Sequence, residues 1–181
     1  IQTQLQKAQQ LFAGLHFKLG MHFKRMVSQN FIDLENRKGK RSGAFCTSMP
    51  DENKVMLFCN STGDADDISA IVHESGHSFQ GWESLWIEPV ELRWPTMEAC
   101  EIHSMGMEFL ALDKMEIFFS PEDARKFKME RLEQTVALFP YICVVDEFQH
   151  EVYAHPTWTP DERAVCWSRI WDAYMEGDDF S

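Results

Sequence analysis

The hydrophobic positions in the first third of the chain predict a helix, a loop and a short strand. Across residues 1–30 they recur at mixed three- and four-residue steps, which is typical of a helix packed in the core. Residues 35–44 (ENRKGKRSGA) carry basic residues and glycines, which indicates a loop. Residues 54–59 (KVMLFC) form an apolar run long enough for a buried strand, so we expect two or three strands near residues 43–60.

A helical pattern returns from about Asp66 to about Gln80. One predicted face carries a mostly apolar set of side chains at helical offsets: Ile68, Ile71, Val72, Ser75 and Phe79. A different face carries Asp66, His73 and His77. Acidic residues at the start of this segment suit the positive end of a helix dipole. We therefore predict a helix with an apolar back and two histidines on another side.

The rest of the chain is predicted to be mostly helical. Tryptophans and prolines indicate an irregular connection over residues 81–95. Further helices are expected over residues 96–119, 121–139, 141–154 and 161–175. Helix therefore dominates, and the pattern predicts a mainly α (α+β) fold class with a small β-sheet.

Length and composition are those of an ordinary globular domain. The chain has 181 residues, of which 44% are hydrophobic and 25% are charged, which is enough for a core and argues against general disorder. Its net charge of −12 argues against nucleic acid or an anionic membrane surface as a partner. Its apolar runs are far shorter than the roughly 20 residues that a membrane-spanning helix needs.

The cysteines and the start of the sequence bear on compartment and completeness. Five cysteines occur without a CxxC pair, so we expect free, mostly buried thiols in a reducing compartment. The sequence opens without a signal peptide, and we expect a cytoplasmic location. It begins at Ile1 rather than at a methionine, which we interpret as a fragment of a longer protein.

Candidate chemistry enters with residues 73–77, His-Glu-Ser-Gly-His, which match the pattern H-E-x-x-H. Residues four apart lie on the same side of a helix, so His73 and His77 can bind one zinc ion through neutral imidazole nitrogens. Glu74 then lies beside the metal, where it can act as general base on zinc-bound water. Gly76 indicates that another element comes close to this helix, because an unneeded helix glycine costs about 1 kcal/mol.

A catalytic zinc ion needs a third protein ligand and an open fourth position. The next predicted helix offers Glu98, Glu101, His103 and Glu108. Glu101 and Glu108 share a face with Ser104 between them, so one carboxylate can bind zinc while the other orients a ligand histidine. Spacing leaves both Glu98 and Glu101 open as the third ligand. We expect His103 to be a packed or capped polar residue rather than a ligand.

Four segments, in the same order, resemble the oligoendopeptidase F branch of the thimet oligopeptidase-like zinc peptidases. Residues 39–46 (GKRSGAFC) are similar to the family segment G-K-x-x-G-A-[FY]-C, and residues 60–77 (NSTGDADDISAIVHESGH) contain its H-E-x-G-H motif. Residues 94–110 (WPTMEACEIHSMGMEFL) resemble the family helix that supplies the third ligand. Residues 146–163 (DEFQHEVYAHPTWTPDER) resemble a further family segment, and the resemblance spans residues 31 to about 175.

The resemblance implies a single zincin-like helical catalytic core over residues 1–181. It implies a small sheet beside the metal helix, one zinc ion per chain and hydrolysis of short peptides rather than folded proteins. The family pattern E-x-x-S-x-x-x-E makes Glu101 the third ligand and leaves Glu98 as a neighbour. In the same pattern Ser104 and Glu108 support the ligands from behind.

Family members are usually several times longer, so the resemblance also implies missing segments. In the family, a helical region that roofs the substrate channel precedes this core, and a segment with a histidine and a tyrosine cluster follows it. Those side chains hold the carbonyl oxygen in the transition state, and losing one such donor can cost roughly 10²–10³ in rate. We do not expect replacements here, and interpret His150 and Tyr153 as helix packing and His155 as helix-end polarity.

Three interpretations of function compete. The first is a zinc metalloendopeptidase for oligopeptides, in which Gly43, Ala44 and Phe45 pair with the extended substrate backbone. The second is a zinc-stabilised fragment with little or no activity, which forms homo-oligomers through the surface that the missing segments leave exposed. A metallocarboxypeptidase is the third, and it is less favoured because residues 39–46 and 94–110 fit the endopeptidase better.

Overall fold

The computed structural model describes residues 1–175, and these divide into two compact units. The first unit comprises residues 1–125 and contains the sheet and the predicted site. The second unit begins at Lys126 and is helical. The expectation that residues 1–181 form one catalytic core stays a prediction, because a division into packing units does not define a functional domain.

The first unit begins with a pair of helices, α1 (Gln2–Leu15) and α2 (Phe17–Ser28). The prediction of one helix over residues 1–30 is therefore wrong at His16, whose backbone is extended. The imidazole Nδ1 of His16 accepts a hydrogen bond of 3.3 Å from the backbone N–H of Lys18, so it caps α2. A Cβ atom on Gly20 would lie 2.7 Å from the Cα of Ala13, so the glycine allows the two helices to pack backbone to backbone.

Within the described residues, one sheet has three strands: β1 (Ile32–Glu35), β2 (Phe45–Met49) and β3 (Lys54–Ser61). The strand order is β1-β3-β2, with β1 parallel and β2 antiparallel to β3. The predicted buried strand is confirmed as β3, and a short 3₁₀ helix, Pro50–Glu52, joins it to β2. Strand β1 lies before the predicted range and was not predicted. Its four residues are too few to give a clear alternation of apolar and polar positions.

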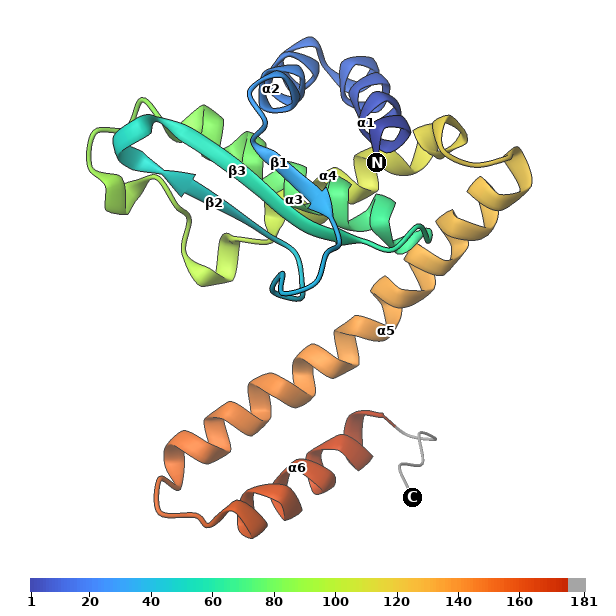
Figure 1. Cartoon of the computed structure of the whole chain (residues 1–181). Coiled ribbons are helices and arrows are strands. Elements are labelled where there is room, and N and C mark those ends of the chain that lie inside the picture. The colour runs from blue at the N-terminus through green and yellow to red at the C-terminus, as the bar shows by residue number, and fades with distance from the viewer. Residues whose placement is uncertain (176–181) are drawn as a thin grey trace. The chain divides into compact units, whose positions relative to one another are not determined.

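Helix α3 (Asp66–Ser84) lies across one face of this sheet (Figure 1). Its predicted apolar face is confirmed, because all five side chains are buried: Ile68, Ile71, Val72, Ser75 and Phe79. Gly81 brings the helix against β3, where its Cβ would lie 3.2 Å from the side chain of Val55. The ring of Phe79 also meets that of Phe12 edge-on, with 4.9 Å between centroids. The core of the first unit therefore fixes α3 between the sheet and α1.

The segment after α3 is helical in pieces. Helix α3 runs to Ser84, so the predicted irregular connection is shorter than expected, and it contains a 3₁₀ turn at Val90–Leu92. The helix predicted over residues 96–119 is a 3₁₀ turn at Met97–Ala99, helix α4 (Ile102–Ala111) and a 3₁₀ helix at Leu112–Ile117. Helix α4 packs against α3, and this contact decides the geometry of the site.

The second unit contains α5 (Pro121–Ala154) from residue 126 onward, together with α6 (Pro160–Tyr174). The predicted break between residues 139 and 141 is wrong, because Pro140 lies inside α5. A proline removes one helical hydrogen bond, and a long helix retains the others on both sides. The core of the unit consists of Val144, Cys166 and Ile170 with partly buried aromatic rings packed against them.

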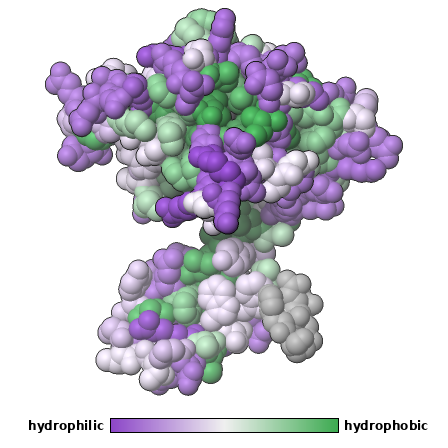
Figure 2. All heavy atoms as spheres, viewed as in Figure 1, coloured by the Kyte–Doolittle hydropathy of each residue, from purple (hydrophilic) through white to green (hydrophobic). Residues whose placement is uncertain are grey.

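Surface properties agree in part with the composition. Figure 2 shows polar residues (purple) over much of the viewed surface, with apolar residues (green) reaching it in both units. Among residues 1–175, no helix has the length and apolar character to cross a membrane.

All five cysteines are free, and burial raises the pKa of the Cys46 and Cys59 thiols to about 12. Cys143 is exposed. The other four thiols are buried or partly buried, in agreement with the expectation of mostly buried thiols.

Candidate metal centre

Two imidazoles and one carboxylate converge on a single point between α3 and α4. His73 and His77 lie one helical turn apart on α3, and their rings meet edge-on with 5.0 Å between centroids. The Nε2 atom of His73 lies 3.1 Å from Oε2 of Glu101, and the Nε2 atom of His77 lies 3.4 Å from the same oxygen. One donor atom from each of the three residues lies within 4.8 Å of the others.

Glu101 reaches the histidines because α3 and α4 touch backbone to backbone. Glu101 immediately precedes α4. A Cβ atom on Gly76 would lie 2.5 Å from the carbonyl oxygen of His103 and 2.7 Å from the Cα of Ser104. The interpretation of Gly76 as a point of close approach is therefore confirmed, since any larger residue would push the helices apart.

Each of the three converging side chains has its own hydrogen-bond partner on α4. Glu108 Oε1 lies 2.7 Å from His73 Nδ1, and the Ser104 hydroxyl donates to Glu101 Oε2 at 2.5 Å. His103 Nε2 lies 2.8 Å from His77 Nδ1. Ser104 is fully buried, which makes its hydroxyl a fixed donor. Ser104 and Glu108 thus contact Glu101 and His73, and their role in supporting metal ligands stays a prediction.

Glu74 lies beside this cluster with a carboxylate that is mostly enclosed. The residue is 7% exposed, and its Oε2 atom has no hydrogen-bond partner among the described residues. Burial raises the pKa of Glu74, and the positive charge that His73 can carry opposes that rise. A buried carboxylate oxygen without a partner normally requires water, an ion or a ligand beside it. Its place next to the three donors therefore fits the reaction side of a metal site.

The surroundings also bias the protonation of the donors. The hydrogen bond from His73 to Glu108 raises the pKa of His73, whereas burial lowers the pKa of His77 and of His103. For Glu101, partial burial raises the pKa, but the Ser104 hydroxyl and the two imidazoles outweigh it and the net shift is downward. An ionised Glu101 beside a neutral His77 is the form in which these groups bind a cation.

The donor set fits zinc. Two imidazole nitrogens and one carboxylate are a ligand set of catalytic zinc sites, which keep a fourth position for water or substrate. The Glu101 side chain is 51% exposed whereas that of His77 is 9% exposed, so the cluster opens toward solvent on the carboxylate side. Glu98, the other candidate for third ligand, is exposed and is absent from the described cluster of three.

His103 was missed as a contributor to the site. The expectation of a packed polar residue is correct in that its ring packs against Trp94, with 6.1 Å between centroids. Its hydrogen bond to His77 joins residues 26 positions apart, which sequence periodicity does not reveal. The signal available in the sequence was a histidine two positions after Glu101 on the same segment as the other supporting side chains.

The predicted substrate segment lies where the loop before β2 meets the sheet. Gly43 has a φ of +90°, which favours glycine, and its carbonyl accepts a hydrogen bond of 2.8 Å from the Asn60 side chain. Gly43 and Ala44 line a pocket of about 230 Å³ that extends along the start of α3 to Asp66 and Ala70. The ring of Phe45 instead stacks on that of Phe58 across the sheet, with 4.6 Å between centroids.

The histidines and tyrosine near the end of α5 lie in the second unit. The packing expected of His150 and Tyr153 is wrong, because the His150 side chain is 81% exposed and Tyr153 is 79% exposed. Helix-end polarity is confirmed for His155, whose Nδ1 lies 2.9 Å from the carbonyl oxygen of Glu151 in the last turn of α5. Its ring also stacks on Trp158.

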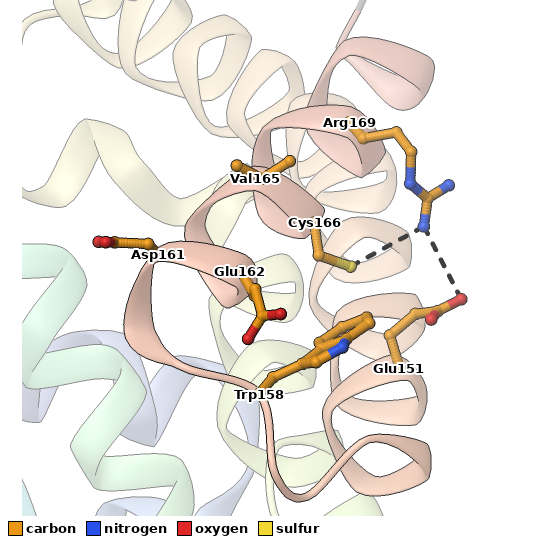
Figure 3. A pocket seen from close by; sticks show the side chains of 7 residues that line it. All are labelled: Glu151, Trp158, Asp161, Glu162, Val165, Cys166 and Arg169. Atoms are coloured by element: carbon orange, nitrogen blue, oxygen red, sulfur yellow. Dashed lines mark hydrogen bonds and ion pairs between the residues drawn. The ribbon is translucent and has the colours of Figure 1, made fainter.

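The second unit contains a larger pocket of its own, of about 500 Å³ (Figure 3). Arg169 lies on its rim, with Nη2 3.7 Å from Glu151 Oε1 and 3.8 Å from Cys166 Sγ. Trp158 and Val165 supply much of the apolar wall. Arg169 is paired with Glu151, and Glu162 hydrogen bonds to Thr159 at the start of α6. The predicted metal ligands belong to the other unit.

Comparison with known proteins places these features in a family context. The family model for peptidase family M3 matches residues 15–177. Over 74 residues, the chain is 36% identical to the chromosomal oligoendopeptidase F of Lactococcus lactis subsp. cremoris, which covers 41% of this chain and 12% of that protein.

Solved structures match over nearly the whole chain. One structure assigned to oligoendopeptidase F matches with a TM-score of 0.92 and 41% identity, covering 100% of this chain and 32% of that one. PZ peptidase A with an inhibitor matches with a TM-score of 0.92 and 39% identity over the same shares. The chain therefore spans about a third of the length of these structures. The resemblance to oligoendopeptidase F and the mainly helical fold with a small sheet are confirmed.

Proposed function

Because the chain belongs to peptidase family M3, we propose that it is the catalytic core of a zinc metalloendopeptidase that hydrolyses short peptides. The observation that carries the proposal is the convergence of His73, His77 and Glu101 beside the buried carboxylate of Glu74. The names of the similar oligoendopeptidases and of PZ peptidase A support a peptide substrate. The proposed location is the cytoplasm, where the free thiols would persist.

In this proposal His73 and His77 would hold one zinc ion through their Nε2 atoms, and Glu101 would hold it through its carboxylate. When bound, zinc supplies Lewis-acid chemistry, which polarises a scissile carbonyl and makes a water molecule more acidic. Glu74 accepts the proton of the attacking water and delivers it to the nitrogen of the leaving amine. Its enclosed position supports this role, because a carboxylate shielded from bulk solvent exchanges protons with the nearest reactant.

The substrate is proposed to lie along the free side of β2. Within the described chain, β2 is an edge strand that pairs with β3 alone, and it approaches α3 where Ser78 contacts Cys46 at 3.3 Å. An extended peptide can add to such an edge through backbone hydrogen bonds. Gly43, Ala44 and Phe45 would then contact the substrate backbone at the start of the strand.

The test compares Glu74→Gln with Glu83→Gln, which removes a carboxylate from the same helix at an exposed position. Zinc content is measured by elemental analysis, and cleavage by an internally quenched oligopeptide with mass spectrometry of the products. We expect about one zinc ion in both variants and a loss of roughly 10²–10⁴ in cleavage rate for Glu74→Gln alone. Undiminished cleavage in that variant would remove Glu74 from the mechanism, and release of single C-terminal residues would indicate a carboxypeptidase.

A second candidate function is a zinc-stabilised assembly with little activity. Exposed apolar side chains recur at three- and four-residue steps along α5, which favours helix-to-helix association: Met129, Leu132, Val136 and Phe139. Sedimentation velocity of the zinc-loaded chain separates the two candidates. Dimers or larger assemblies without peptide cleavage would support the second, whereas a cleaving monomer would exclude it.

A further inference from the structure

The two histidines of the H-E-x-x-H motif have different partners behind them. His73 Nδ1 faces the carboxylate of Glu108 at 2.7 Å. His77 Nδ1 faces a second imidazole, with 2.8 Å to His103 Nε2. Metal-binding histidines usually donate their other ring N–H to an acceptor, which fixes the tautomer and the orientation of the ring. A neutral histidine in that position is a less common acceptor than a carboxylate or a carbonyl.

The inference rests on the proposed function, in which His77 binds zinc through Nε2. That atom must then carry a lone pair, so the proton of His77 lies on Nδ1. The Nδ1–H group therefore donates, and His103 Nε2 must accept. Since a neutral imidazole carries one proton, His103 bears its own on Nδ1. One arrangement of protons satisfies both rings and leaves His77 Nε2 free for the metal.

Packing holds the His103 ring in this position. Its backbone touches α3 at Gly76, where a Cβ atom would lie 2.5 Å from the His103 carbonyl oxygen. Trp94 covers both rings, with 5.7 Å between its centroid and that of His77 and 6.1 Å to that of His103. The His77 and His103 ring centroids lie 4.9 Å apart with their planes inclined by 78°. With the two nitrogens only 2.8 Å apart, this separation places the contact between the nitrogen-bearing edges of the two rings.

We propose that His103 is a positioning residue that holds His77 in the tautomer and orientation required to bind zinc, through an uncharged acceptor. The charge balance gives a reason for the choice of residue. Glu74, Glu101 and Glu108 already place carboxylates around the cluster, and each reduces the positive potential of a bound cation. A further carboxylate behind His77 would reduce it again, whereas a neutral imidazole orients the ligand without adding charge.

The experiment measures zinc affinity by competition with a chromophoric chelator in the 181-residue chain and in four variants. His103→Phe retains a ring against Trp94 but removes the acceptor, and His103→Gln places an amide oxygen near the position of Nε2. His150→Phe is the control, since it makes the same change at an exposed position of the second unit. Visible absorption of the cobalt-substituted proteins reports ligand geometry independently of activity.

We expect His103→Phe to bind zinc 10- to 100-fold more weakly and to shift the cobalt bands. The Gln variant should recover most of the affinity, and His150→Phe should match the unsubstituted chain. His103→Leu is a second apolar variant and must show the same loss, so that a folding defect of the Phe variant does not decide the result. Thermal unfolding of the metal-free proteins tests whether His103 contributes packing rather than a hydrogen-bond acceptor. A packing role would lower the unfolding midpoint of the Phe and Gln variants alike.

The outcomes distinguish the inference from the proposal on which it rests. If the unsubstituted chain binds no zinc, the proposed function fails and this inference fails with it. If the unsubstituted chain binds zinc and both apolar variants bind it equally tightly with unchanged cobalt bands, the inference alone is overturned. A Gln variant as weak as the Phe variant would also overturn it, because the acceptor would not be what His103 contributes.

Discussion

Gly76 on α3 and His103 at the start of α4 lie in backbone contact, and a Cβ atom at residue 76 would be 2.5 Å from the His103 carbonyl oxygen. This contact sets the spacing between the helix that carries the H-E-x-x-H motif and the segment that carries Glu101. Three side chains on α4 hydrogen bond to the converging donors at this crossing. The glycine is therefore a determinant of the site although it has no side chain of its own.

Gly76→Ala is expected to damage both stability and metal binding. The new methyl group would overlap backbone atoms, which move only if α3 and α4 separate, and such overpacking costs typically 1–3 kcal/mol. Gly106→Ala is the matched control on α4, because its Cβ would meet no described atom within 4 Å apart from its chain neighbours and the adjacent backbone of its own helix. It should stabilise the chain by up to about 1 kcal/mol. Urea unfolding and zinc titration check both, and equal stability of the two variants would contradict the prediction.

Glu101→Ala is expected to abolish tight zinc binding, and Glu98→Ala is expected to leave it unchanged. Glu101 Oε2 lies 3.1 Å and 3.4 Å from the two imidazole nitrogens, whereas Glu98 is exposed three positions earlier. The loss should exceed the roughly 10- to 100-fold effect of removing a supporting side chain. Calorimetric titration with zinc measures both variants. Normal affinity in Glu101→Ala together with loss in Glu98→Ala would reverse the assignment.

Glu108→Ala is expected to weaken zinc binding by about 10- to 100-fold, because His73 would lose the carboxylate that orients its ring. Glu108→Gln should show a smaller loss, since an amide oxygen still accepts from Nδ1 but carries no charge. Glu116→Ala, at an exposed position after α4, is the control. Competition with a chelator gives the three dissociation constants. A Gln variant weaker than the Ala variant would argue against the orienting role.

The loop before β2 should respond to acid through Asp33. Hydrogen bonds from Arg37, at 2.8 Å to each carboxylate oxygen, are the main reason that the pKa of Asp33 falls from 3.8 to about 2, and Lys40 adds to the effect. A pKa that is lower in the folded state gives stability that is complete above about pH 4 and is lost as the pH falls toward 2.

The measurement compares unfolding of the unsubstituted chain and Asp33→Asn between pH 2 and pH 5. We expect a difference of about 1 kcal/mol at pH 5, reduced because the side chain is 30% exposed, and a difference near zero at pH 2. The comparison between the two proteins removes the contribution of other carboxylates. A difference that grows toward low pH would have the wrong sign for this ion pair.

Local pattern was sufficient for several parts of the molecule. The run at residues 54–59 predicted β3, and the helical offsets from Ile68 to Phe79 predicted the buried face of α3. The spacing of His73 and His77 placed both imidazoles on one side of a helix, since side chains four apart are neighbours in any α-helix. These features depend on interactions within a short stretch of chain, so the local sequence is sufficient to predict them.

Other parts depended on contacts between distant residues. The break at His16 depends on the packing of α1 against α2 at Gly20, and the continuity of α5 through Pro140 overrides a residue that usually ends helices. Spacing left Glu98 and Glu101 equivalent, and the family pattern was needed to choose between them. In the structure, the contact of α4 with α3 brings Glu101 to the histidines.

The sequence by itself determined that His73 and His77 lie on one side of a helix with Glu74 between them, because their relative positions are those of residues within one helix. Only the tertiary structure decided which residues meet them from outside that helix. Glu108 and His103 lie 35 and 26 positions from their histidine partners. Such pairs are set by where two helices cross, and the crossing depends on side-chain volume at Gly76 and on burial of the whole apolar face, which no local spacing encodes.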